Sequence, residues 1–185
     1  MANQSAAEII AEWPEDSREA AQLVIDAYGE PAEAVPSKLT WFDAGSWKRI
    51  EAQRTFWQHD FPAPHIDAVE TFIDYRVPVE MFTPLAQFDG SVMVERTSGE
   101  VSARCHDEQA NTLALNLMHD IVTGARDADD ARAYYAKEFL DARRKRPTPY
   151  MDGLRFGSKG SAAADPDERV LSDEQLEAAK KEGGE

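Results

Sequence analysis

Four histidines, one cysteine and the acidic residues beside them are the side chains of this sequence that could carry acid–base, nucleophilic or metal chemistry. Two groups stand out by their spacing: His65 with Asp67 and Glu70, and the run Cys105–Asp107. An imidazole beside a carboxylate can exchange protons or bind a transition metal. A thiol beside an imidazole can become a nucleophile. Either chemistry requires that the secondary structure points these side chains toward one another.

The first group is expected on a helix over residues 64–75, because Pro64 suits the first helical position. At about 100° per residue, His65 shares the apolar arc of that helix, whereas Asp67 and Glu70 point to water. Residues two apart on a helix do not face each other. The favoured interpretation is a first-turn histidine that is hydrogen-bonded at the edge of the core. The alternative is a ligand or catalytic role together with a distant element.

The second group is interpreted as structural. Cys105 is expected on the inward face of a hairpin, where a thiol behaves as a small apolar side chain. His106 follows it on the strand and therefore points to the other side. Asp107 is expected to cap the next helix. A nucleophilic cysteine would need an adjacent base and partial exposure, so Cys105 should react slowly with thiol reagents.

A helix over residues 108–123 carries an unusual amide. Its eight apolar residues occupy one arc, and Asn111 lies inside that arc. A buried amide without partners costs about 1–3 kcal/mol. Asn111 should therefore bond to the hairpin or to an irregular loop, or else line an internal pocket. His119 lies on the polar side of the same helix and is expected to be solvated.

Several function classes are excluded. The lone cysteine excludes an internal disulfide and multi-thiolate zinc or iron–sulfur sites. Glycine-rich phosphate loops, the two-histidine zinc motif and the Gly-x-Ser-x-Gly turn are absent from the sequence, so we expect no metal and no cofactor. The net charge of −15 argues against a nucleic-acid or anionic-membrane partner. The basic run Arg143–Arg146 lacks interleaved aromatics and suits a helix C-terminus.

The order of elements predicts an α+β fold, in which helices pack on one face of an antiparallel sheet that contains a 91–105 hairpin. Apolar residues recur at helical or alternating spacing in most of the chain. Beyond the helices at 64–75 and 108–123, the pattern predicts helices at 17–28 and 129–146 and strands at 38–42 and 46–54.

The hairpin has Ser98–Gly99 at its predicted tip. A two-residue loop there pairs Val94 with Ala103 and Val92 with Cys105. All four of these residues then lie on one face, and a slip by one residue would oppose apolar to polar side chains.

Three regions are expected along the chain. Residues 1–15 form an N-terminal extension, in which Ser5 and Glu8 have capping-box spacing at the start of a short helix. Residues 16–156 form a single globular domain. Residues 157–185 begin with small residues, continue as an acidic stretch without aromatics, and are predicted to be a flexible tail.

The central region resembles an uncharacterised prokaryotic protein family of unknown function. The resemblance is carried by residues 59–79 (HDFPAPH to IDYRVPV), 88–92 (FDGSV), 102–105 (SARC) and 113–124 (LALNLMHDIVTG). It covers about residues 16–156. It implies one cytoplasmic domain and supplies no catalytic residues.

The leading hypothesis is a soluble, non-catalytic binding or interaction protein of a prokaryotic cytoplasm, with an unidentified protein or small-molecule partner. No secretion signal or membrane-length apolar run is visible. The acidic, lysine-poor composition is typical of proteins in a salt-rich cytosol. The alternative hypothesis is a small enzyme or small-molecule binder with a pocket near Asn111, His65 and His106. In that case Asn111 would orient a ligand and one of the two histidines would move protons; no catalytic residue is assigned.

Overall fold

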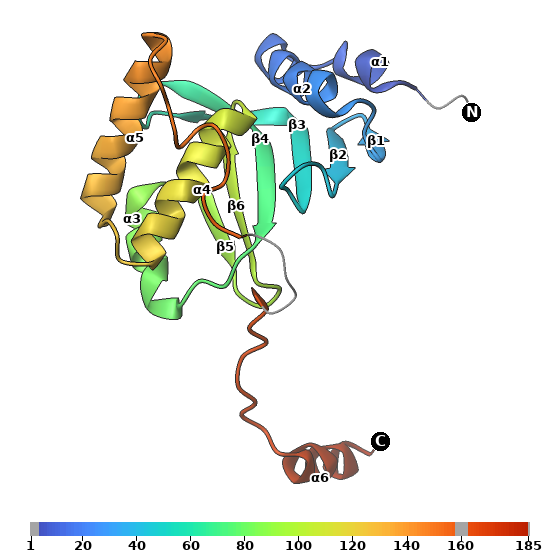
Figure 1. Cartoon of the computed structure of the whole chain (residues 1–185). Coiled ribbons are helices and arrows are strands. Elements are labelled where there is room, and N and C mark those ends of the chain that lie inside the picture. The colour runs from blue at the N-terminus through green and yellow to red at the C-terminus, as the bar shows by residue number, and fades with distance from the viewer. Residues whose placement is uncertain (1–3, 158–162, 185) are drawn as a thin grey trace.

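The computed structural model describes residues 4–157 and 163–184, in which helices pack against a six-stranded antiparallel sheet (Figure 1). This arrangement confirms the predicted α+β fold. The strand order is β1-β2-β3-β4-β6-β5. The helices are α1 (Ala6–Ile10), α2 (Glu15–Tyr28), η1 (Val79–Met81, a 3-10 turn), α3 (Phe82–Phe88), α4 (Glu108–Val122), α5 (Ala128–Arg143) and α6 (Asp173–Gly183). The strands are β1 (Glu33–Val35), β2 (Lys38–Phe42), β3 (Arg49–His59), β4 (His65–Asp74), β5 (Val92–Glu95) and β6 (Glu100–Cys105).

One face of the sheet carries the core. Leu39, Ala52, Val69 and Cys105 are cross-strand neighbours and form one buried row across four strands. Helix α2 contacts strands β3 and β4, and helix α4 contacts strands β4 and β6. Strands that are half-buried in this way show the alternation of apolar and polar residues on which the sequence prediction depends.

The opposite face of the sheet is covered by its own long side chains. Arg49 pairs with Glu51 at 3.1 Å and with Glu100 at 2.8 Å, and its guanidinium lies 3.5 Å from the centre of the Phe72 ring. Glu70 is buried beneath this layer, and burial raises its pKa, although a hydrogen bond from Ser102 and the charge of a nearby arginine partly oppose the shift. This face therefore carries polar networks rather than a second apolar layer.

The helix predicted for residues 64–75 is wrong, because the chain forms strand β4 there. β4 lies between β3 and β6, and every residue from Ala68 to Ile73 is buried. A central strand that is buried on both faces has no simple alternation, and the polar residues inside it mimic a helical period. The segment is nevertheless rich in β-branched and aromatic residues, which favour strands. As a consequence, His65 and Asp67 lie on the same face.

The hairpin is present, but its predicted register is wrong. Val94 pairs with Val101 rather than with Ala103, because the loop spans the four residues 96–99 instead of two. The carboxylate of Glu95 accepts hydrogen bonds from two backbone amides of this loop and so stabilises the longer turn. The register differs from the predicted one by an even number of residues, so the apolar side chains still face the core.

The N-terminal residues contribute to the core. Helix α1 begins with the predicted capping box of Ser5 and Glu8. Ile10 and Trp13 are almost completely buried, and the Trp13 indole donates a hydrogen bond to the carbonyl of Pro36 at 2.8 Å. The predicted extension thus packs against α2 and the β1 edge of the sheet.

The C-terminal residues extend away from the sheet (Figure 1). Arg96 in the hairpin loop pairs with Asp165 and Asp167, both at 3.0 Å. Beyond these contacts, α6 has the Ser172 and Gln175 capping box and no buried residue. Residues 158–162, part of the predicted flexible tail, lie outside the described residues. Among the described helices, none is both long and apolar enough to cross a membrane.

Candidate functional site

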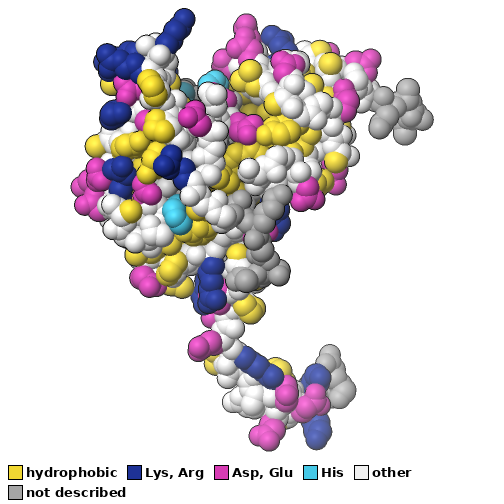
Figure 2. All heavy atoms as spheres, viewed as in Figure 1, with side chains coloured by type: hydrophobic (Ala, Val, Ile, Leu, Met, Phe, Trp, Pro, Cys, Tyr) yellow, Lys and Arg dark blue, Asp and Glu magenta, His cyan; other side chains and the backbone are white. Residues whose placement is uncertain are grey.

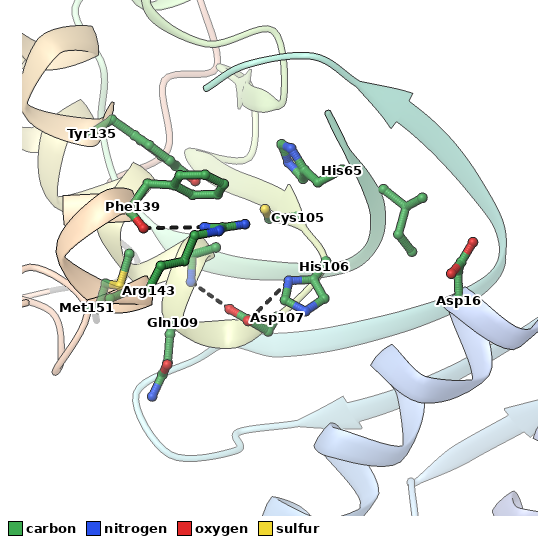
Figure 3. A pocket seen from close by; sticks show the side chains of 13 residues that line it. Asp16, His65, Cys105, His106, Asp107, Gln109, Tyr135, Phe139, Arg143 and Met151 are labelled. Carbon is green, nitrogen blue, oxygen red and sulfur yellow. Dashed lines mark hydrogen bonds and ion pairs between the residues drawn. The ribbon is translucent and has the colours of Figure 1, made fainter. Parts of the chain in front are cut away.

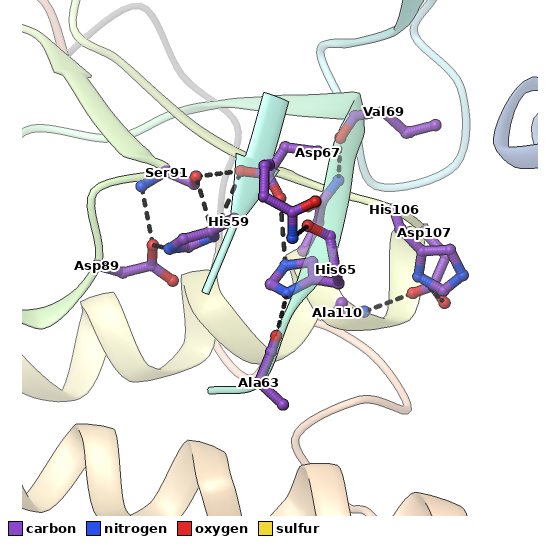
Figure 4. Close-up of polar contacts among 12 residues, drawn as sticks. His59, Ala63, His65, Asp67, Val69, Asp89, Ser91, His106, Asp107 and Ala110 are labelled. Atoms are coloured by element: carbon purple, nitrogen blue, oxygen red, sulfur yellow. Dashed lines mark hydrogen bonds and ion pairs between the residues drawn. The ribbon is translucent and has the colours of Figure 1, made fainter. Parts of the chain in front are cut away.

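Strands β3 and β4 bring two imidazoles and a carboxylate together (Figure 4). His65 Nε2 lies 3.2 Å from Asp67 Oδ1, and His59 Nδ1 lies 3.4 Å from Asp67 Oδ2. The centroids of the two imidazole rings are 5.0 Å apart. His59 is the cross-strand partner of His65, so both rings lie at the same end of the sheet. The prediction that His65 and Asp67 point apart is therefore wrong, and its cause is the strand that replaces the helix.

A second group of side chains surrounds this His59–His65–Asp67 cluster. The Ser91 hydroxyl donates a short hydrogen bond to Asp67, and the Asp89 carboxylate lies 3.8 Å from His59 Nε2. Both Ser91 and Asp89 belong to the segment that leads from α3 into β5 and are buried. The cluster therefore depends on a loop about thirty residues away in the sequence.

The charges of the cluster are shifted by burial and by its close contacts. Burial alone would lower the pKa of His65, but the Asp67 carboxylate beside the ring outweighs it, together with Cys105 and the backbone carbonyl of Ala63, and the pKa is raised. Burial also raises the pKa of Asp89. His65 is therefore a cation when no other cation binds Asp67.

A pocket of about 380 Å³ lies next to the cluster, between α5, the N-terminal end of α4 and the first residues of β4 (Figure 3). This volume is in the range of small-molecule sites. The side chains of His65, Cys105 and Tyr135 form its inner wall, and His106 and Arg143 lie nearer the solvent. The wall is completed by Asp16, Ile66, Asp107, Gln109, Ala110, Phe139, Ala142 and Met151.

Two of the three predicted ligand-binding residues line this pocket. His65 and His106 do so, and His106 is half-exposed, with its Nδ1 3.1 Å from Asp107. Asn111 is fully buried, does not line the pocket, and donates a hydrogen bond to the Val69 carbonyl at 3.0 Å. Its partner is thus strand β4, rather than the hairpin or a loop.

The polar side of α4 is covered by the chain that follows α5. The His119 Nδ1 lies 2.7 Å from the Tyr75 hydroxyl, and the ring stacks on Phe156 at 4.5 Å between centroids. The prediction that His119 is solvated is therefore wrong. The sequence offered no local signal for this, because the covering residues follow Pro147 and have no regular secondary structure.

Sequence reasoning also missed His59, Asp89 and Ser91. His59 and His65 flank a proline-rich turn, and two strands joined by a short turn place such residues opposite each other. That signal was hidden by an irregularity in β3, where the register with β4 shifts between Ala52 and Trp57.

The inward position of Cys105 predicts slow thiol chemistry. The side chain is 7% exposed, and burial raises the pKa of the thiol, partly opposed by His65. We expect a maleimide or a disulfide reagent to label native Cys105 at least about 100-fold more slowly than the unfolded chain at neutral pH. Labelling at the rate of the unfolded chain would contradict the inward assignment.

Comparisons with family models, curated proteins and solved structures found no match to this chain. The resemblance to an uncharacterised prokaryotic family stays a prediction.

Proposed function

We propose that this protein binds a small organic molecule in the 380 Å³ pocket beside α5. The observation that carries the proposal is the position of His65, which belongs to the buried His59–His65–Asp67 cluster and also forms part of the pocket wall. Ligand sites combine an apolar lining with a few convergent polar groups. The alternative hypothesis from the sequence is a small enzyme or small-molecule binder with a pocket near Asn111, His65 and His106. Its small-molecule form is favoured here, with His65 and His106 but not Asn111 in the pocket wall.

The lining suggests the chemistry of the ligand. Ile66, Phe139 and Met151 offer apolar surface for the body of a molecule. The Arg143 guanidinium can donate hydrogen bonds to an acceptor, and the positive charge of His65 favours an anionic group nearby. A small organic acid with an apolar body fits both sets of groups, and we take this as the ligand class.

The setting of the pocket supports a binding protein rather than an enzyme with a cysteine nucleophile. The Cys105 thiol is buried and neutral, so it lacks the exposure and the lowered pKa that a nucleophile needs. We also propose a cytoplasmic location, supported by the acidic composition. The hypothesis of a protein-interaction module stays a second prediction.

The proposal is tested by closing the pocket from its rim. Ala142 lies on α5 at the pocket and is exposed, so Ala142→Phe should fill the opening without disturbing the core. Ala133→Phe places the same side chain on an exposed position of α5 outside the pocket and is the matched control. A thermal-shift screen with a library of small organic acids should give stabilising compounds for the wild type and for Ala133→Phe.

The same compounds should lose most of their effect on Ala142→Phe. An equal shift in both variants would place the binding elsewhere. A flat screen with the wild type would contradict the proposed ligand class.

A further inference from the structure

We propose that His59, His65 and Asp67 bind a single divalent transition-metal ion of the Zn²⁺ type. This inference rests on different observations from the proposed small-molecule function, but His65 is common to the pocket and the cluster, so a bound metal ion would replace the His65 charge beside the pocket. It departs from the expectation from the sequence that the protein binds no metal.

The spacing of the ligand atoms is close to that of a zinc site. Zinc bonds to nitrogen and oxygen are about 2.0–2.1 Å long, so two ligand atoms of a tetrahedral site are about 3.3 Å apart. His65 Nε2 lies 3.2 Å from Asp67 Oδ1, and His59 Nδ1 lies 3.4 Å from the other oxygen of the same carboxylate, Oδ2. Ligand atoms of all three residues lie within 4.8 Å of one another. One ion can therefore contact all three side chains after small rotations.

Both imidazoles have a group behind them that can support a metal ligand. His65 Nδ1 lies 2.8 Å from the carbonyl oxygen of Ala63, so it donates its proton there and leaves Nε2 facing Asp67. Metal-binding histidines almost always donate the other ring proton to a carbonyl or a carboxylate, which fixes the tautomer and the ring orientation. His59 directs Nδ1 to Asp67 and to the Ser91 hydroxyl, and the buried Asp89 carboxylate lies 3.8 Å from its Nε2, just beyond hydrogen-bond distance (Figure 4). His65 thus has its supporting partner in place, and a small movement would give His59 one.

One oxygen of the Asp67 carboxylate is held by charge alone. Asp67 is 1% exposed, and its Oδ1 accepts no well-formed hydrogen bond from the described residues; its partner is the His65 imidazole, with Nε2 3.2 Å away. The Ser91 hydroxyl fixes the other oxygen. A buried carboxylate needs compensation, and a bound metal ion would take over the role that the positive charge of His65 has in the metal-free protein.

The ligand set selects the class of metal. Two imidazoles and one carboxylate suit Zn²⁺, Fe²⁺ or Co²⁺, whereas Ca²⁺ takes six to eight oxygen ligands and Mg²⁺ an octahedral oxygen shell. Three protein ligands leave at least one coordination position open, as in catalytic rather than structural zinc sites. The inference is therefore a metal centre that can bind water or a ligand atom.

The test uses the full-length chain after chelator treatment and removal of the chelator. We expect ZnCl₂ to bind with a stoichiometry of one in isothermal titration calorimetry, and CoCl₂ to give visible absorption bands that ZnCl₂ abolishes. His59→Gln should weaken zinc binding by at least about 100-fold. Asp89→Asn, which removes the carboxylate charge behind His59 and keeps an oxygen for the Ser91 amide, should weaken it by about 10- to 100-fold.

His106→Gln is the matched control, because His106 is an exposed histidine that also pairs with an aspartate. This variant should bind zinc like the wild type. The proposal is overturned if His59→Gln or Asp89→Asn binds zinc as tightly as the wild type, or if His106→Gln causes the larger loss. If His59→Gln does not fold, the comparison of Asp89→Asn with His106→Gln decides by the same criterion.

Discussion

Asp67→Ala is expected to lower the free energy of unfolding of the metal-free protein by about 3 kcal/mol, because removing one partner of a buried charge pair leaves the other uncompensated. The Asp67 carboxylate raises the pKa of His65 and accepts the Ser91 hydrogen bond. Without it, a charged imidazole and a buried hydroxyl lose their partner. For a chain of this length, the melting temperature should fall by about 6–12 °C.

The control for this prediction is Asp107→Ala. Asp107 also lies beside a histidine, with 3.1 Å between His106 Nδ1 and its carboxylate, but that pair is half-exposed. Asp107 caps α4 through the Ala110 amide, so its loss should cost about 1 kcal/mol. Urea denaturation of both variants measures the difference. Equal losses would show that the buried cluster adds no stability beyond an ordinary helix cap.

The cluster explains why the sequence favoured the wrong hypothesis about this region. Asp67, Glu70 and Asp74 recur at three- and four-residue spacing between apolar residues, which is the signature of an amphipathic helix. In the strand, two of these carboxylates are buried by neighbours from other elements: Asp67 by the α3–β5 loop and Glu70 by the polar face of the sheet. Hydrogen-bond partners from distant parts of the sequence thus allow a central strand to contain buried acidic residues.

Other elements could be predicted because each carries its own signal. Helices α2 and α4 have one apolar face each, and they end where Gly29 and Gly124 follow with positive φ. The hairpin also could be predicted, with only its turn length in error. What local patterns do not contain is the pairing of β3 with β4 and therefore the position of His59 next to Asp67.

For the pocket, the sequence identified two of the residues that form the wall. His65 and His106 were candidates on residue type alone, and both line the pocket. The α5 side of the pocket, from Tyr135 to Arg143, was expected to be only a packing helix and a basic run. In Figure 2, basic side chains gather at the C-terminal end of α5, the end that borders the pocket. Residue type therefore indicated the chemistry, whereas the topology decided which side chains share the cavity.

Asn116→Ala is expected to destabilise the protein by about 3 kcal/mol, although a helical-wheel argument places Asn116 on the solvated side of α4. The amide is 1% exposed. It donates to the carbonyls of Tyr150 and Gly153, both at 2.9 Å, and accepts from the Arg155 amide at 2.8 Å. Each buried hydrogen bond contributes about 1 kcal/mol, and the backbone groups left behind lose their partners.

The segment that Asn116 holds also carries Met151, which forms part of the pocket wall. We therefore expect hydrogen exchange of the Arg155 amide to accelerate in Asn116→Ala, because its acceptor is gone. Asn111→Ala is the matched control, since Asn111 is equally buried but makes one hydrogen bond, and its Oδ1 has no donor among the described residues. Its cost should be about 1 kcal/mol. If both variants lose the same stability, burial of the amide rather than its three bonds to the segment sets the cost.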